Sequence, residues 1–191
     1  RCILSELNTL LKHTEENYEA YNPTTIARSI QDFVINKLSN WYVRLNRRRF
    51  WKGKYSSDKF SAYQTLYECL ENISIISAPI APFFMDQMFQ DLNSVGKKHS
   101  VASVHLADFP RYNRLYINTD LERRMSLAQS ITSLALSLRK KEKIRVRQPI
   151  QKIMLPIHDS KTQKDVESVS NILKSELNIK EIVFLNKNSN I

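Results

Sequence analysis

Apolar side chains recur every three or four residues along most of the first 145 positions of the chain. This is the spacing of one buried face of an α-helix. Asn22 and Pro23 mark one helix start, because Asn caps a helix N-terminus and Pro suits the first helical position. Residues 100–116 contain Pro110 and carry no helical period, which predicts an extended surface segment. The helices are expected over residues 2–19, 23–48, 57–77, 80–92 and 120–143.

The pattern changes after residue 145. Ile153, Leu155 and Ile157 alternate with more polar residues, which favours a strand. Residues 165–177 return to helical spacing, and residues 182–185 form a second apolar run typical of a buried strand. The sequence therefore predicts a mainly α fold. It consists of a helical bundle over residues 1–145 and a small α/β (strand–helix–strand) subdomain over residues 146–191.

Charge is concentrated in two short segments. The chain has 191 residues and a net charge of +10, and residues 40–60 and 139–152 each carry +6. The rest of the chain is slightly acidic. Such single-sign clusters are typical of a polyanion partner, although a solvated face or a membrane-surface patch would look the same. The basic residues of the two segments are Arg44, Arg47, Arg48, Arg49, Lys52, Lys54 and Lys59, then Arg139, Lys140, Lys141, Lys143, Arg145, Arg147 and Lys152.

Composition excludes several classes of site. The only two glycines, Gly53 and Gly96, cannot build a glycine-rich phosphate loop. Cys2 and Cys69 lie far apart in helical patterns, and the four histidines are scattered, so neither a disulfide scaffold nor a zinc site is indicated and a reducing compartment is expected. No apolar run reaches the roughly 18 residues of a membrane-spanning helix. Since the chain begins with Arg1, we expect a fragment of a longer protein.

Aromatic and arginine side chains interleave over residues 41–51. On a helix, Trp41, Arg44 and Arg48 share one side. Arginine pairs bidentately with phosphate, and aromatic rings stack on unpaired bases. This combination favours a folded RNA with a splayed loop. In the competing interpretation, Trp41 and Trp51 belong to the core and only the arginines face outward.

The second basic segment has two interpretations. Basic residues at a helix C-terminus offset the helix dipole, so part of the segment can be structural. An extended Arg145–Arg147 would instead place both arginines on one face.

Several segments resemble the anticodon-binding helical domain of the isoleucyl-tRNA synthetase family, which belongs to class Ia. The most specific is Leu38–Arg44 followed by Arg47–Trp51, which reads LSNWYVR and then RRRFW. This pattern is closer to the isoleucine enzymes than to the valine or leucine enzymes. The other matching segments are Leu4–Asn8, Ala78–Phe83, Ser103–Pro110 and Lys143–Ile150.

The resemblance implies a cytoplasmic, monomeric ligase whose catalytic body lies outside this chain. The parent enzyme would use ATP and magnesium to join isoleucine to its tRNA. This chain would dock the anticodon stem-loop of isoleucine tRNA, with no cofactor of its own. The class I signature motifs HIGH and KMSKS are absent, so no catalytic residue is predicted. This sequence lacks the cysteines of the zinc-binding tail found in bacterial members of the family, so zinc is possible only in a tail beyond residue 191, or this member lacks the tail.

The residues expected to contact tRNA come from both basic segments. Trp41 is expected either to stack on a base or to belong to the core. A second hypothesis remains open, in which the chain is a basic helical module that binds acidic protein or an anionic membrane. The predicted tRNA contacts are Arg44, Arg47, Arg48, Arg49, Trp51, Lys52, Arg145 and Arg147.

Overall fold

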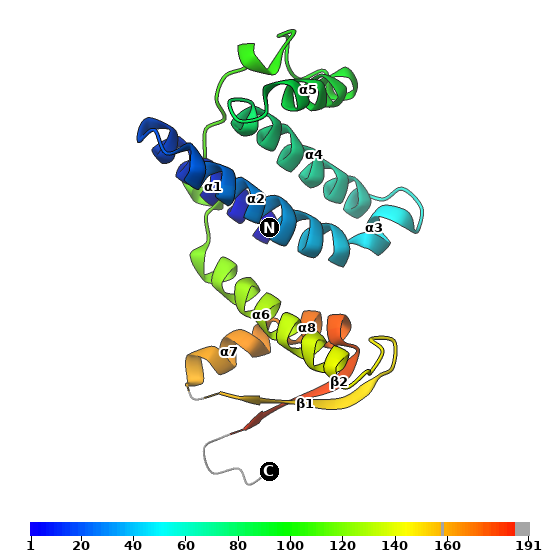
Figure 1. Ribbon diagram of the computed structural model, residues 1–191. Helices are drawn as coiled ribbons and strands as arrows, with labels where there is room; N and C mark the ends of the chain where they lie inside the picture. The colour runs from blue at the N-terminus through cyan, green and yellow to red at the C-terminus, as the bar shows by residue number, and fades with distance from the viewer. Residues whose placement is uncertain (158, 186–191) are drawn as a thin grey trace. The chain divides into compact units, whose positions relative to one another are not determined.

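The computed structural model describes residues 1–157 and 159–185 (Figure 1). The chain divides into two compact units, Arg1–Asn118 and Thr119–Ile191. The first is helical. The second combines helices with a two-stranded sheet. The predicted fold class, mainly α with a small strand-containing subdomain, is confirmed.

The first unit packs its helices around two apolar clusters, the smaller of which joins Ile75 and Ala78 to Phe89 and Val104. Leu7, Leu10 and Leu11 of the first helix meet Ile26 and Ile30 of the second, and Figure 1 shows these two helices side by side. Buried residues of the fourth helix, including Cys69, complete the core. The elements are α1 (Cys2–Glu19), α2 (Pro23–Asp32), η1 (Phe33–Val43), α3 (Arg47–Trp51), α4 (Ser57–Ser77) and α5 (Pro82–Gly96), followed by the 3₁₀ turns η2 (Val104–Leu106) and η3 (Arg114–Tyr116).

The helix predicted over residues 23–48 changes its winding at Phe33. α2 is an ordinary α-helix, but η1 is a π-helix of eleven residues. The backbone N–H of Arg44 still donates to the carbonyl of Ser39, five residues earlier. Phe33 and Leu38, also five residues apart, are both buried. The spacing of apolar residues does not predict these wider turns, because apolar residues lie both four and five positions apart in this segment.

Helix α4 begins one residue beyond its cap, Ser56, whose hydroxyl accepts a hydrogen bond from the Lys59 N–H at 3.3 Å. Helix α5 starts two residues later than predicted and extends to Gly96. A Cβ at Gly96 would lie 2.1 Å from the hydroxyl oxygen of Tyr67. Tyr67 donates to the carbonyl of Leu92 at 3.2 Å, so the glycine allows α4 and α5 to approach each other.

The extended segment after α5 is fixed to α1 by two buried polar side chains. The N–H of Asn113 donates to Oδ1 of Asn8, and the N–H of Asn118 donates to Oγ of Ser5, both at 2.7 Å. Asn8 and Ser5 are almost inaccessible to solvent. These contacts account for polar residues on the buried face of α1.

The second unit contains α6 (Thr119–Lys141), β1 (Ile150–Pro156), α7 (Ser160–Ser168), α8 (Ser170–Leu177) and β2 (Ile179–Leu185). The two strands pair in parallel, with Ile150 opposite Ile179. The helices lie together on one side of the strand pair (Figure 1). The single helix predicted over residues 165–177 is two helices. The first starts at Ser160, because Asp159 caps it by accepting from the Thr162 N–H at 2.7 Å.

Helix α6 packs against α7 and α8. Asp165 of α7 pairs with Arg123 of α6, and Arg139 at the other end of α6 is 5% exposed. The guanidinium of Arg139 donates to the carbonyls of Arg145 and Gln148 at 3.0 Å each and of Leu177 at 2.6 Å. By its contacts α6 belongs to the second unit, whereas the sequence analysis assigned residues 119–145 to the helical bundle. The predicted domain boundary at residue 145 stays a prediction.

Candidate nucleic-acid interface

The first basic segment runs from the end of η1 through α3 into the loop before α4. We define the arginine segment as residues 44–54. Arg44, Arg47 and Arg48 are exposed, and so is Lys52. Trp51 is 80% exposed, at the end of α3. The arrangement presents charged guanidinium groups and one flat apolar ring to solvent within a few residues.

Arg49 differs from its neighbours because its donors are used inside the chain. Nε donates to Oδ2 of Asp58 at 2.8 Å, and Nη2 donates to Oδ1 at 2.6 Å. Nη1 donates to Oδ1 of Asn46 at 2.6 Å. This bidentate pair joins α3 to the first turn of α4. Arg49 therefore positions the arginine segment, and the phosphate contact predicted for it stays a prediction.

The two tryptophans have different environments. Trp41 is 8% exposed, on the core side of η1. Its indole Nε1 is buried and finds no hydrogen-bond partner within residues 1–157 and 159–185. A ring in this position packs in the core, and a base cannot stack on it without a rearrangement. Trp51, by contrast, is available to a partner.

Arg145 and Arg147 belong to the second unit and are exposed. Of the two interpretations of this segment, the extended one does not hold, because the N–H of Gln148 donates to the carbonyl of Arg145 at 3.0 Å and closes a turn. The carbonyl of Arg145 also accepts from the buried Arg139. This hydrogen bond to Arg139 requires a turn that directs the Arg145 carbonyl toward α6. Their tRNA contact stays a prediction.

The sequence analysis missed an aromatic pair next to the arginine segment. Tyr55 and Phe60 are 77% and 59% exposed, with ring centroids 5.7 Å apart and an interplanar angle of 31°. The Nζ of Lys59 lies 5.0 Å from the centroid of the Tyr55 ring. Here too, aromatic residues alternate with lysines. That signal was in the sequence and could have been used.

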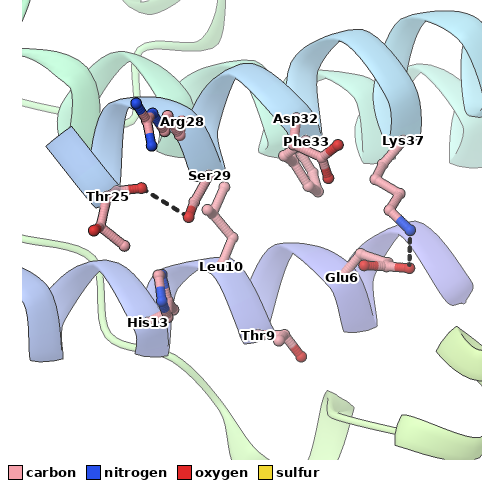
Figure 2. Close-up of a pocket in the computed structure, with 10 residues that line it drawn as sticks. All are labelled: Glu6, Thr9, Leu10, His13, Thr25, Arg28, Ser29, Asp32, Phe33 and Lys37. Atoms are coloured by element: carbon pink, nitrogen blue, oxygen red, sulfur yellow. Dashed lines mark hydrogen bonds and ion pairs between the residues drawn. The ribbon is translucent and has the colours of Figure 1, made fainter.

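A polar groove of about 560 Å³ lies between α1 and the α2–η1 helix. Figure 2 shows His13 and Arg28 on facing helices and an ion pair of 3.3 Å between Lys37 and Glu6. Ser29 donates to the carbonyl of Thr25 at 2.9 Å. The lining mixes both signs of charge, and no residue predicted to contact tRNA belongs to it. The other lining residues are Thr9, Leu10, Asp32 and Phe33.

Cys2 and Cys69 are free thiols, and burial raises the pKa of Cys69 to about 12. In the part of the chain that the structure describes, no three His, Cys, Asp or Glu side chains are grouped so that they could hold a metal ion. No helix among the described elements is long and apolar enough to cross a membrane.

Comparison with known proteins bears on this geometry. The family model for the anticodon-binding domain of tRNA ligase matches residues 1–154. The chain belongs to this family. The match includes the arginine segment and α6 and ends within β1, so it extends across both compact units. It does not support the alternative of a module that binds acidic protein or membrane.

Curated relatives agree with the family. The chain is 51% identical over 191 residues to isoleucine–tRNA ligase of Cytophaga hutchinsonii, and 51% identical over 185 residues to that of Bacteroides fragilis. It is 41% identical over 182 residues to isoleucine–tRNA ligase of Clostridium tetani. The matches cover 95–100% of this chain but only 16–17% of each relative. The predicted resemblance to the isoleucine enzymes is confirmed.

Proposed function

We propose that this chain binds the anticodon stem-loop of isoleucine tRNA, as the non-catalytic RNA-binding part of an isoleucine–tRNA ligase. The family match and the identity to isoleucine–tRNA ligases support this function. The structural observation that carries it is the arginine segment, in which Arg47 and Arg48 are exposed to solvent while Arg49 is held in an ion pair with Asp58.

The side chains divide the task of binding according to their chemistry. Arg47 and Arg48 pair with backbone phosphates, since a guanidinium presents two parallel donors to one phosphate. Trp51 stacks on an unpaired base of the loop. Arg49 holds α3 against α4 and so fixes the direction in which its neighbours point. Further phosphate contacts come from Arg44, Lys52, Arg145 and Arg147.

The remaining chemistry belongs to the longer protein. In this proposal the parent uses ATP and magnesium to activate isoleucine and transfer it to the tRNA, in the cytoplasm and as a monomer. The partner of the present chain is then the catalytic body. By binding the anticodon end of the tRNA, the chain orients the distant acceptor end toward that body. A zinc ion would belong to a separate tail.

The test is equilibrium binding of the chain to isoleucine tRNA and to the same tRNA with a changed anticodon, at two salt concentrations. We expect tighter binding to the native anticodon. Replacing Arg47 and Arg48 by Ala should weaken binding and reduce the slope of log affinity against log salt by about 0.7 per lost contact to unpaired RNA. Arg111→Ala is the control, since Arg111 is an exposed arginine of the same unit outside the segment. Equal binding to both tRNAs would contradict anticodon recognition by this chain.

A further inference from the structure

A groove of about 430 Å³ follows α4, next to the arginine segment. Phe60, Tyr63, Gln64 and Tyr67 are three and four residues apart and therefore share one face of α4. Leu92 of α5 forms the opposite wall. Leu66 and Leu70 complete the lining. The groove is thus lined by three aromatic rings, three leucines and one side-chain amide.

The rings along the groove are held in place. The hydroxyl of Tyr63 donates to the carbonyl of Phe50 at 2.9 Å, and that of Tyr67 donates to the carbonyl of Leu92 at 3.2 Å. Phe60 packs on Tyr55, and the Lys59 ammonium makes a cation–π contact with the Tyr55 ring. Phe60 and Tyr63 nevertheless remain 59% and 44% exposed. Exposed rings with fixed orientations suit stacking, because a ligand need not order them.

Positive charge flanks the groove. Lys52 and Lys54 are exposed in the loop that leads to Tyr55. At the other end, Nζ of Lys98 lies 4.6 Å from the centroid of the Tyr67 ring and 3.0 Å from Oε2 of Glu71. Phe60 and Tyr67 are about 10 Å apart along the axis of α4, from a rise of about 1.5 Å per residue. A short stretch of polyanion can therefore reach Lys52 and Lys54 at one end of the groove and Lys98, which is paired with Glu71, at the other.

We propose that this groove binds an unpaired base of the RNA, stacked on Phe60, with the Gln64 amide at the edge of the base and the flanking phosphates toward the lysines. The inference rests on the proposed function and extends it beyond the arginine segment. Stacking accepts any base, whereas a side-chain amide offers an NH₂ donor group and a carbonyl acceptor that discriminate between base edges. The flanking cations favour a nucleic acid over an apolar peptide, which would gain nothing from them.

The experiment uses the anticodon stem-loop of isoleucine tRNA with 2-aminopurine placed at each unpaired position in turn. Stacking on Phe60 should quench the fluorescence at one position when the chain binds. Phe60→Ala should abolish that quenching and weaken binding about five-fold to a hundred-fold. The salt slope should stay unchanged, because no charge is removed. Phe83→Ala is the matched control, since Phe83 is 91% exposed and lies outside the groove.

Two further variants separate the possible outcomes. Phe60→Trp keeps a ring and should preserve the quenching, which excludes misfolding as the cause of the alanine effect. Gln64→Ala should reduce discrimination between bases at the quenched position. If the unchanged chain binds in an Arg47- and Arg48-dependent manner but Phe60→Ala has no effect, the groove inference is overturned while the proposed function stands. If the unchanged chain does not bind the stem-loop, both are overturned.

Discussion

Arg49 and Asp58 form a bidentate ion pair, with hydrogen bonds of 2.8 and 2.6 Å, across the loop that separates α3 from α4. The pair is partly exposed, so its contribution to global stability is small. Its effect is local. It closes a loop of eight residues and fixes five residues of helix that carry three consecutive arginines.

We predict that Asp58→Asn loosens α3 without unfolding the chain. Amide hydrogen exchange over residues 47–51 should become up to about five-fold faster, as expected for the loss of about 1 kcal/mol or less from an exposed pair. Asp91→Asn serves as the control, since Asp91 is an exposed acid that accepts from Gln87 within α5. Unchanged exchange in α3 would show that Asn46 and the backbone carbonyl of Asp58, which accepts from Nη2 of Arg49 at 3.0 Å, are enough to hold Arg49.

Gly96→Ala should destabilise the first unit by about 1–3 kcal/mol, because the new methyl group overlaps the Tyr67 side chain. Urea denaturation measures the difference. Val95→Ala provides the comparison at the same helix end, where an 84% exposed side chain should change stability by less than about 0.5 kcal/mol. Equal stability of the two variants would mean that α4 and α5 can separate freely at this point.

Arg139→Leu should destabilise the second unit by about 3 kcal/mol, because the carbonyls of Arg145, Gln148 and Leu177 lose their donor. Arg139→Lys should recover little, since an ammonium cannot reproduce the guanidinium fork. Thermal unfolding of each variant checks this. Lys140→Ala, at the exposed neighbour, is the control, and a comparable loss there would argue against the hydrogen bonds as the cause.

The second unit should lose stability in acid. Hydrogen bonding to Arg123 lowers the pKa of Asp165 below its ordinary value of 3.8. Because the folded state favours the carboxylate, the stabilisation is present above about pH 4 and is lost as the pH falls through the lowered pKa. Asp165→Asn should be less stable at neutral pH and show a weaker decline below about pH 4. Glu167→Gln is the control, because Glu167 is an exposed neighbour, and this variant should keep the steep loss of stability in acid. An equally steep loss in Asp165→Asn would exclude Asp165 as its source.

Periodic patterns predicted the elements that follow ordinary helical spacing. The bounds of α1 and α4 match the sequence prediction because regularly spaced residues such as Leu7, Ile73 and Ile76 are buried. The start of α7 was missed, since its first turn is polar and only the Asp159 cap marks it. Burial of single aromatic residues was beyond prediction. Trp41 and Trp51 sit in similar sequence surroundings, yet Trp41 is buried in η1 and Trp51 is exposed at the end of α3.

The arginine pattern was visible in the sequence, but the sequence did not show which arginines are exposed and which are held by contacts within the chain. Arg49 is distinguished from Arg48 by Asp58, a residue nine positions away that α4 brings back toward α3. Arg139 likewise looked like part of a surface cluster, and its burial depends on carbonyls of residues 145, 148 and 177. Such roles depend on long-range contacts that a local pattern does not contain.

Because the turns of η1 are wide, the number of residues in η1 determines which of the side chains after it face solvent. In an α-helix each residue turns the following side chains by about 100°. Removing one residue between Phe33 and Val43 and restoring α-helical winding would turn the whole arginine segment relative to the core, although no arginine had been replaced. The orientation of the charged surface thus depends on how many residues η1 contains. An insertion or deletion within η1 would alter RNA binding more than most substitutions.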